Sequence, residues 1–221
     1  MPRRTRFATG GYVFHVLNRA VGRATLFETD GDYAAFLKVL EEARHHVPMR
    51  LLAYAVLPNH WHLVLWPVGD DDLSNYMHWL TVAHTQRWHA FHGTSGTGPL
   101  YQGRFKSFPV ETDDHFYRLV RYVERNGLRA NLASRAERWR WCSLWQHENQ
   151  SWPVSLDAWP LPRSPQWTEF VNGIESEAEL DALRNSVKRG CPYGSPVWQR
   201  GTATALGLDA TLRSRGRPRQ S

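Results

Sequence analysis

The spacing of apolar residues over the first 130 positions predicts alternating strands and helices. Four apolar runs rich in β-branched and aromatic residues are typical of strands: 12–20, 50–58, 60–67 and 103–111. Three stretches with apolar residues at helical spacing are typical of helices: 31–46, 71–93 and 112–127. The first six elements follow the order β-α-β-β-α-β of a ferredoxin-like fold. We therefore expect an α+β protein in which one antiparallel sheet carries helices on one face.

The predicted helix at 112–127 has signals at both ends. Thr112 is the expected N-cap, acidic residues follow it in the first turn, and Gly127 is the expected end. Four apolar residues of this helix fall within about 100° of one another and form its expected buried face: Phe116, Leu119, Val120 and Val123.

Beyond residue 132 the pattern weakens, and we expect a C-terminal extension. A tryptophan-rich stretch at 139–147 is expected to pack this extension onto the body. The extension itself is expected to hold two helices and a disordered basic tail: 175–190, 194–208 and 213–221. The expected division is a first domain at 1–147 and a helical, basic extension at 148–221.

The composition is that of an ordinary globular protein. Of 221 residues, 42% are hydrophobic and 22% charged, which excludes collagen-like, fully disordered and coiled-coil proteins. No run approaches the roughly 18 consecutive apolar residues of a membrane span, and the basic N-terminus lacks the apolar segment of a secretory signal. Two cysteines, Cys142 and Cys191, cannot form a disulfide scaffold. We expect a cytoplasmic protein with no membrane partner.

Positive charge gathers at the two ends of the chain. The net charge is +6, from 27 Lys and Arg against 21 Asp and Glu, and residues 188–221 alone hold seven cations against one acid. A second group precedes the first acid, Glu28: Arg3, Arg4, Arg6, Arg19 and Arg23. Basic ends on a balanced body favour a polyanion partner. Solvated tails that keep the protein soluble are the alternative, and composition leaves the two open.

The first candidate site is the tripeptide His60-Trp61-His62. Because strand side chains alternate, the two histidines share one face and Trp61 lies on the other. Two imidazoles one pleat apart can chelate one divalent ion. Two surface histidines on a half-exposed strand are the alternative, because His-x-His alone is a weak motif.

The second candidate lies on the helix at 112–127. Tyr122 and Asn126 are four residues apart and sit on one flank of its buried face. Three arginines form a basic stripe beside them: Arg118, Arg121 and Arg125. A tyrosine with a carboxamide one turn away and arginines alongside is compatible with a nucleophile in a phosphate site. An ordinary interface tyrosine is the alternative. Tyr117 lies on the opposite flank, so we expect it to be structural.

Together the two candidates suggest phosphodiester chemistry. Tyrosine has an unperturbed pKa of about 10, so it needs a metal-polarised electrophile and a neutralised phosphate to attack. Two histidines and an amide oxygen suit Mg²⁺ or Mn²⁺ better than zinc, which favours more nitrogen and sulfur ligands.

Four segments resemble the single-tyrosine HUH transposases, above all the REP-associated tyrosine transposases. They occur in the family's order within residues 10–147: HVLNRAVGRATLF (15–27), YAVLPNHWHLVLWP (54–67), YQGRFKSFPVE (101–111) and RYVERNGLRANL (121–132). The resemblance implies that His60 and His62 are metal ligands, that Tyr122 is the nucleophile and that Asn126 completes the metal site. One departure from the family pattern is Gly127, where relatives often have proline. Because that proline is not a ligand, the departure bears on where the helix ends and not on the chemistry.

The resemblance also implies a reaction and its setting. A metal would polarise a phosphate of hairpin-forming, REP-type single-stranded DNA, and Tyr122 would attack it to give a 5′-phosphotyrosine link and a free 3′-OH. The setting would be the nucleoid of a bacterial cytoplasm. Short relatives form dimers, whereas the branch with a long C-terminal extension is more often monomeric, so we expect a monomer with a dimer as the alternative.

Ten basic residues are candidates for DNA contact: Arg3, Arg4, Arg6, Arg104, Lys106, Arg118, Arg121, Arg125, Arg217 and Arg219. Solvated tails are the alternative for those near the termini. His84 falls on the apolar stripe of its helix, so we expect a core histidine.

Two other functions compete with the transposase. A hairpin-binding or regulatory protein that has lost catalysis would keep the fold, but the intact His60, His62, Tyr122 and Asn126 argue against it. A hydrolase of small phosphoesters would suit the ligands, but it leaves both basic termini unexplained.

Overall fold

The computed structural model describes residues 9–151 and 153–213. Five of the expected DNA contacts lie outside these residues, as does most of the expected basic tail: Arg3, Arg4, Arg6, Arg217 and Arg219. No helix in the described ranges is both long and apolar enough to cross a membrane.

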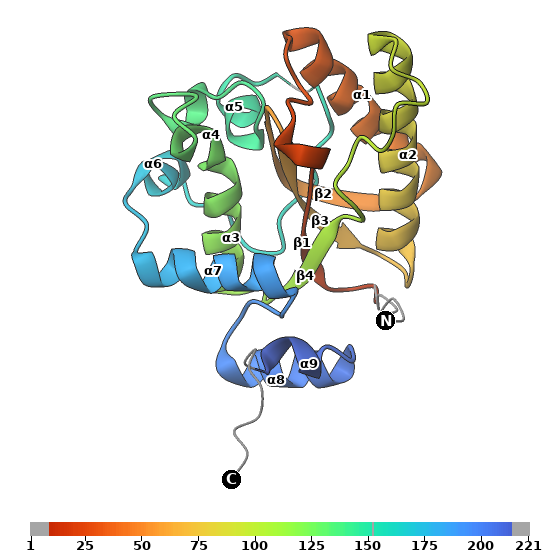
Figure 1. The fold of residues 1–221 in the computed structure, drawn as a ribbon. Helices are drawn as coiled ribbons and strands as arrows, with labels where there is room; N and C mark the ends of the chain where they lie inside the picture. The colour runs from red at the N-terminus through yellow and green to blue at the C-terminus, as the bar shows by residue number, and fades with distance from the viewer. Residues whose placement is uncertain (1–8, 152, 214–221) are drawn as a thin grey trace.

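Four antiparallel strands form the sheet at the centre of the molecule (Figure 1). They are β1 (Val13–Arg19), β2 (Met49–Leu57), β3 (His60–Pro67) and β4 (Lys106–Val110). Their spatial order is β2-β3-β1-β4, so the two central strands are β3 and β1. This order confirms the predicted ferredoxin-like α+β fold. The strand expected at 103–111 is shorter than predicted, because regular pairing with β1 begins only at Lys106.

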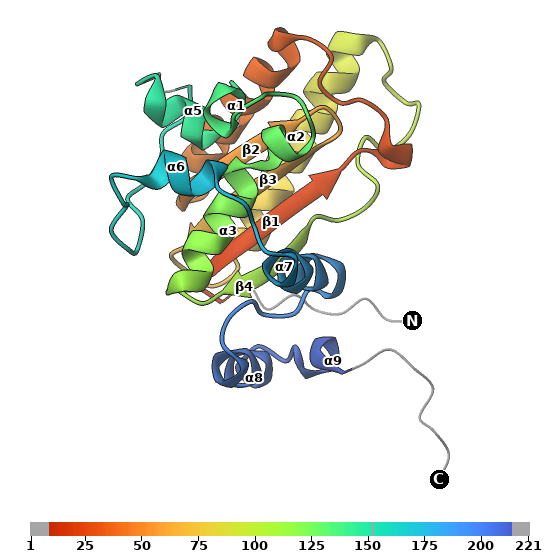
Figure 2. The ribbon, with the colours of Figure 1, turned by 90° about the vertical axis from the view of Figure 1, so that its left-hand side faces the viewer.

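Two long helices cover one face of the sheet. α1 (Asp30–His46) and α2 (Asp72–His92) pack side by side over a core that includes Trp61 of β3 (Figures 1 and 2). The Nε1–H of Trp61 donates to the hydroxyl of Tyr101 at 3.0 Å, and that hydroxyl lies 2.6 Å from Nδ1 of His84. His84 is therefore the core histidine that its position predicts, and burial lowers its pKa to about 3.

The opposite face is covered as well, so the prediction of helices on one face is wrong. α3 (Asp114–Glu124) packs there, with four short helices or turns beside it: α4 (Asn126–Arg129), η2 (Ala136–Arg138), α5 (Ser143–Glu148) and α6 (Trp167–Asn172). Figure 2 shows α3 in front of the sheet and α2 behind it. The physical reason is that the central strands are apolar on both faces, as in Leu63 and Val64, and must be buried on both.

The ends of α3 differ from the prediction. Asp113, and not Thr112, is the N-cap, and its carboxylate accepts a hydrogen bond from the backbone N–H of His115 at 2.8 Å. The helix ends at Glu124, and the turn α4 follows directly. Gly127 is therefore not the terminus of α3 but a buried residue of α4.

The C-terminal extension packs into the core between the sheet and α3, and along the edge strand β2. Trp167 Nε1 donates to the buried carboxylate of Glu124 at 2.7 Å, and Trp159 Nε1 donates to the carbonyl of Leu52 at 2.8 Å. Leu52 lies at an irregularity in the pairing of β2 with β3, and irregularities of this kind free backbone groups for other partners. The division at residue 147 stays a prediction, while the core itself includes residues from both sides of it.

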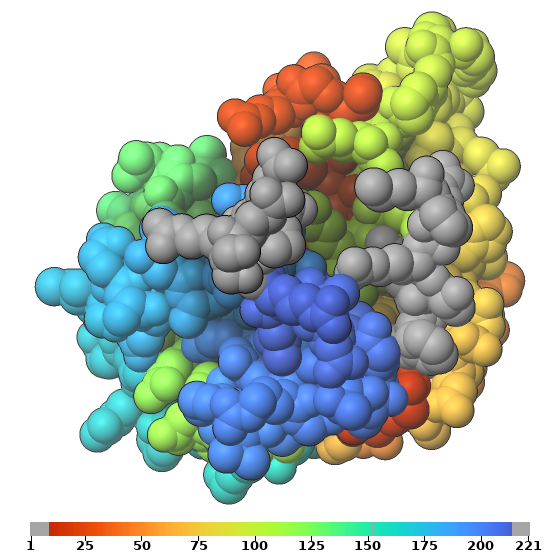
Figure 3. Space-filling model, turned by 60° about the horizontal axis from the view of Figure 1, so that its bottom comes forward, coloured from red at the N-terminus to blue at the C-terminus, as the bar shows by residue number. Residues whose placement is uncertain are grey.

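The last helices lie at one end of the molecule. α7 (Glu177–Arg189) runs along β4, and α8 (Pro196–Ala205) and α9 (Asp209–Leu212) follow beyond it. Figure 3 shows α8 and α9 on the surface at this end. The helix predicted at 175–190 is confirmed, with Ser176 as its N-cap and Gly190 at its C-cap. The remaining described element is the turn η1 (Val21–Arg23) after β1.

The close approach of Gly127 to Trp139 makes a stability prediction. A methyl group at Gly127 would overlap the indole of Trp139, which is held by a 2.9 Å hydrogen bond from its Nε1 to the carbonyl of Val56. We expect Gly127→Ala to destabilise the fold by about 1–3 kcal/mol, as overpacking does. Urea unfolding measures this change.

Gly201 supplies the matched control. It lies in α8 with open space where a Cβ would sit, so Gly201→Ala should stabilise by up to about 1 kcal/mol through helix propensity alone. Equal effects of the two substitutions would show that Trp139 does not crowd Gly127.

Candidate active site

Strand pairing places three histidines on one face of the sheet. In the antiparallel pair of β1 and β3, His15 lies opposite Val64 and Leu17 opposite His62. Residues two apart on a strand share a face, so His15, His60 and His62 all face α3. The ring centroids of His60 and His62 lie 5.0 Å apart. The two predicted metal ligands are therefore neighbours, as their spacing requires.

His15 is a member of this group that sequence reasoning missed. Its side chain is fully buried, its ring stacks on that of His62 at 5.0 Å, and its Nε2 lies 2.9 Å from Nδ1 of His62. If His62 is to present Nε2 to a metal, its Nδ1–H must donate to His15. The sequence gives little indication of this role, because the neighbours of a single histidine in an apolar strand are unknown until the strand register is known.

Helix α3 places Tyr122 over these rings. The ring of Tyr122 lies 5.9 Å from that of His62 and 6.3 Å from that of His15, nearly perpendicular to both. The candidates from the strand and from the helix therefore meet in one site. Tyr117 faces away, and its hydroxyl donates to the carbonyl of Pro162 at 2.7 Å, as expected for a structural residue.

Asn126 is buried one turn after Tyr122. Its Nδ2 donates to the backbone carbonyl of Tyr122 at 2.9 Å, which orients the carboxamide on the helix. Its Oδ1 accepts a hydrogen bond from Arg129 at 3.2 Å. A carbonyl oxygen has two lone pairs, so one remains for another partner.

Two further cations lie at the site, and neither was among the predicted site residues. The guanidinium of Arg129 lies over the Tyr122 ring at 4.4 Å and also pairs with Glu175. Arg19 follows the same face of β1, opposite His60, and its buried Nε has no hydrogen-bond partner among the described residues. In the sequence, only the spacing to other site residues points to these two arginines: Arg129 is seven residues after Tyr122, and Arg19 is four after His15.

The surroundings set the charge states of these groups. Burial lowers the pKa of His15 to about 3 and of His60 to about 4, and it holds the pKa of His62 well below its usual value. Arg19 lowers the last two further. Near pH 7 the rings are neutral, as metal ligation requires. Burial raises the pKa of Tyr122, while Arg129 and Arg19 oppose that rise.

The donor set fits a divalent cation. Two neutral ring nitrogens and an amide oxygen carry no negative charge, so a bound cation would keep its full charge for phosphate oxygens. A different group of potential ligands surrounds the start of α3, formed by Glu111, Asp113 and His115. Seven residues of helix separate His115 from Tyr122, a rise of about 10 Å. Glu111 also accepts a hydrogen bond from the backbone N–H of Ser195, so this group holds α8 in place.

The predicted basic stripe on α3 has internal partners. Arg118 pairs with Glu179 at 3.2 Å, Arg121 donates to the carbonyl of Gly173 at 2.8 Å, and Arg125 pairs with Glu175 at 3.3 Å. These contacts hold the first turn of α7 and the segment before it against α3. A role for the three arginines in DNA contact stays a prediction.

Arg104 and Lys106, by contrast, are exposed. Neither forms an ion pair within the described parts of the chain. They lie just before and at the start of β4, beside the C-terminal end of β1.

The fold and the site together define an α+β protein in which two histidines on one face of a ferredoxin-like sheet lie against a tyrosine of the helix that covers that face. A protein-family model described as "Transposase IS200 like" matches residues 9–126, just over half of the chain. The chain therefore belongs to the IS200-like transposase family. The match ends at Asn126, so it includes all three histidines and Tyr122.

Two solved structures are similar to this chain, and the first of them shares the fold. A REP-associated tyrosine transposase bound to a REP hairpin has a TM-score of 0.53 and 19% identity, over 80% of this chain and 98% of that one. A protein of Deinococcus radiodurans R1 classed as a transposase has a TM-score of 0.40 and 16% identity, over 57% of this chain and 97% of that one. No curated protein matches the sequence.

The contact between His15 and His62 makes a prediction about metal binding. His15→Phe keeps a ring of similar size but removes the nitrogen that faces His62. We expect about 10- to 100-fold weaker Mn²⁺ binding, as for other lost partners of metal-ligating histidines, measured by titration calorimetry. His84→Phe removes a buried histidine outside the site and should leave the affinity unchanged. Equal affinities of the two variants would contradict the role of His15.

Proposed function

We propose that this chain is a metal-dependent endonuclease and strand transferase that acts on hairpin-forming, REP-type single-stranded DNA. The observation that carries the proposal is the position of Tyr122, whose ring lies 5.9 Å from that of His62 on a helix facing both candidate ligands. Membership in the IS200-like transposase family supports this reaction class, and the likeness to a transposase bound to a REP hairpin supports this substrate.

The reaction is a transfer of a phosphoryl group between two oxygens. The phenolic oxygen of Tyr122 attacks the scissile phosphorus and forms a 5′-phosphotyrosine bond. The bond from phosphorus to the 3′ oxygen breaks, and this oxygen takes up a proton to leave as a 3′-OH. The proton lost by Tyr122 balances the one gained by the leaving group. The reverse attack by a 3′-OH rejoins a strand and frees Tyr122.

The metal site and Arg19 act on the charge of the phosphate, and Arg129 acts on Tyr122. His60, His62 and Asn126 would hold Mg²⁺ or Mn²⁺, which when bound polarises the phosphate and offsets its charge. Arg19 is the cation that faces the phosphate position, since it lies opposite His60 with a buried nitrogen that lacks a partner among the described residues. Arg129 holds Tyr122 from the other side and opposes the rise of its pKa.

The DNA partner is recognised by charge around this site. Arg104 and Lys106 are exposed cations at the edge of the sheet that carries the site, and phosphate contacts of this kind supply much of the affinity for DNA. We assign the basic termini, with Arg3, Arg217 and their neighbours, to the same role. We propose that the chain acts as a monomer, because its extension covers the second face of its own sheet. We place it in the bacterial cytoplasm as part of the same proposal.

The assignment of the nucleophile makes a direct prediction. Tyr122→Phe removes only the attacking oxygen, so a labelled hairpin incubated with Mn²⁺ should form no covalent adduct on a denaturing protein gel. Binding of the hairpin should persist, because the phenol ring and its packing remain. Tyr117→Phe is the matched control and should form the adduct at the normal rate. An adduct in Tyr122→Phe would move the nucleophile to another residue.

Metal removal makes a second prediction. Wild-type protein treated with a chelator, and His60→Ala in Mn²⁺, should both bind the hairpin and form no adduct, because the scissile phosphate is no longer polarised. A gel-shift assay measures binding, and the denaturing gel measures the adduct. Cleavage that persists in excess chelator would refute the metal role. Binding without an adduct in wild type, with both metals supplied, would favour a catalytically silent hairpin-binding protein.

A further inference from the structure

The turn between β2 and β3 places Asn59 beside the first candidate metal ligand. Its Oδ1 lies 2.6 Å from Nδ1 of His60. On the other side of the carboxamide, Nδ2 donates to the backbone carbonyl of Arg23 at 3.4 Å. The backbone of Asn59 is held as well, because its carbonyl accepts a hydrogen bond from the N–H of Ala20 at 3.0 Å. One fixed carboxamide therefore connects the turn η1 to the imidazole of His60.

The carbonyl of Arg23 determines which way the carboxamide of Asn59 points. A backbone carbonyl only accepts hydrogen bonds, so it faces the amide nitrogen and not the amide oxygen. The oxygen then faces His60, and because this oxygen also only accepts, the ring must be the donor. The neutral ring of His60 therefore carries its proton on Nδ1.

The position of this proton selects the atom of His60 that can bind a metal. A neutral imidazole binds a metal only through the ring nitrogen that carries no proton. With the proton on Nδ1, the free lone pair of His60 is on Nε2. His62 matches this arrangement, because its Nδ1 faces His15 at 2.9 Å. Nε2 of either ring has no hydrogen-bond partner among the described residues, so both ligands offer the same ring atom in the metal-free protein.

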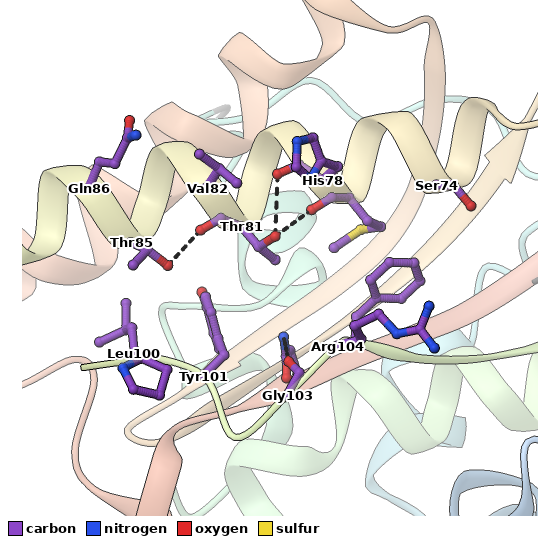
Figure 4. Close-up of a pocket in the computed structure, with 14 residues that line it drawn as sticks. Ser74, His78, Thr81, Val82, Thr85, Gln86, Leu100, Tyr101, Gly103 and Arg104 are labelled. Carbon is purple, nitrogen blue, oxygen red and sulfur yellow. Dashed lines mark hydrogen bonds between the residues drawn. The ribbon is translucent and has the colours of Figure 1, made fainter. Parts of the chain in front are cut away.

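The turn η1 and the segment between α2 and β4 hold the Arg23 carbonyl in place. Arg23 has a φ of 62°, a left-handed conformation that is uncommon for residues other than glycine, and its N–H donates to the carbonyl of Ala20 at 3.2 Å. The N–H of Val21 donates to the carbonyl of Leu100 at 3.0 Å. Figure 4 shows Leu100 and Tyr101 on this segment, across from α2. Such a backbone conformation persists only where its surroundings fix it, and residues of this kind cluster at functional sites.

We propose that Asn59 is a positioning residue that keeps the proton of His60 on Nδ1, so that Nε2 is the nitrogen that binds the metal. Asn59 acts through His60 alone. Without an acceptor at Nδ1, part of the molecules would carry the proton on Nε2, and that proton would have to leave before the metal binds. This inference rests on the proposed function, because it takes His60 as a metal ligand. The position of the proton, by contrast, is a property of the metal-free protein.

Two substitutions at Asn59 separate its hydrogen bond from its volume. Asn59→Leu keeps a side chain of similar size but has no acceptor, whereas Asn59→Asp keeps an acceptor, because an ionised carboxylate only accepts. The backbone of Asn59 lies outside the left-handed region, so it admits both substitutions. Asn149→Leu is the matched control, since Asn149 is exposed at the end of α5 and its side chain donates to the carbonyl of Trp145.

The first measurement is the position of the proton in the metal-free full chain. Two-bond ¹H–¹⁵N correlation spectra of ¹⁵N-histidine-labelled protein distinguish a protonated ring nitrogen from an unprotonated one, and His60→Ala identifies the signals of His60. Wild type, Asn59→Asp and Asn149→Leu should carry the proton on Nδ1. Asn59→Leu should move part of the population to the form protonated on Nε2. A wild-type ring protonated on Nε2 would overturn the inference, whether or not the Asn59 variants fold.

The second measurement is the affinity for Mn²⁺, by titration calorimetry. Asn59→Leu should bind Mn²⁺ about 10- to 100-fold more weakly, as for other lost partners of metal-ligating histidines. Asn59→Asp should bind at least as tightly as wild type, and Asn149→Leu should bind like wild type. Unchanged affinity in Asn59→Leu, or weaker binding with the proton still on Nδ1, would overturn the inference. Failure of the wild type to bind Mn²⁺ would instead overturn the metal site of the proposed function, and the spectra would still test the role of Asn59.

Discussion

The antiparallel pairing of β1 with β3 is the interaction on which the site depends. These strands occupy the centre of the sheet, and their register places His15 beside His62 and Arg19 opposite His60. A slip of one residue would turn the whole row to the other face. Trp61 prevents this slip, because its indole is fully buried in the opposite core and needs the hydroxyl of Tyr101 as its acceptor. The apolar middle residue of His60-Trp61-His62 thus keeps both imidazoles on the side of α3.

The second requirement is that α3 stays in place over this row. Its buried face supplies the apolar contact, and its arginines hold the segment that follows α6. Glu175 of the extension pairs with both Arg125 and Arg129. Arg129, whose guanidinium lies over the Tyr122 ring, is therefore itself held by the extension. Glu124, buried on the same helix, accepts hydrogen bonds from Ser143 at 2.6 Å and from Trp167 at 2.7 Å. The extension therefore acts as a support for the site as well as a cover for the sheet.

Much of this could be predicted from local patterns, and the rest depends on distant partners. The bounds of β3 and the fold order follow from alternation and turn residues, and Tyr122 does lie against His62 as predicted. The face of the sheet that α3 covers could not be predicted, because helical periodicity shows which side of a helix is buried but not which element it packs against. The same limit explains why the internal partners of three arginines in the predicted basic stripe were not foreseen: Arg118, Arg121 and Arg125. Their acceptors lie between 50 and 61 residues further along the chain. His15 was missed because only the strand register shows its neighbour.

The central claim is that Tyr122 becomes covalently linked to the 5′ side of a cleaved DNA strand. Mass spectrometry of the protein, digested after reaction with a hairpin in Mn²⁺, tests it most directly. The account predicts one modified peptide, with the nucleotide attached to the Tyr122 oxygen through its 5′ phosphate. A nucleotide found on another residue, or attached through a 3′ phosphate, would contradict it.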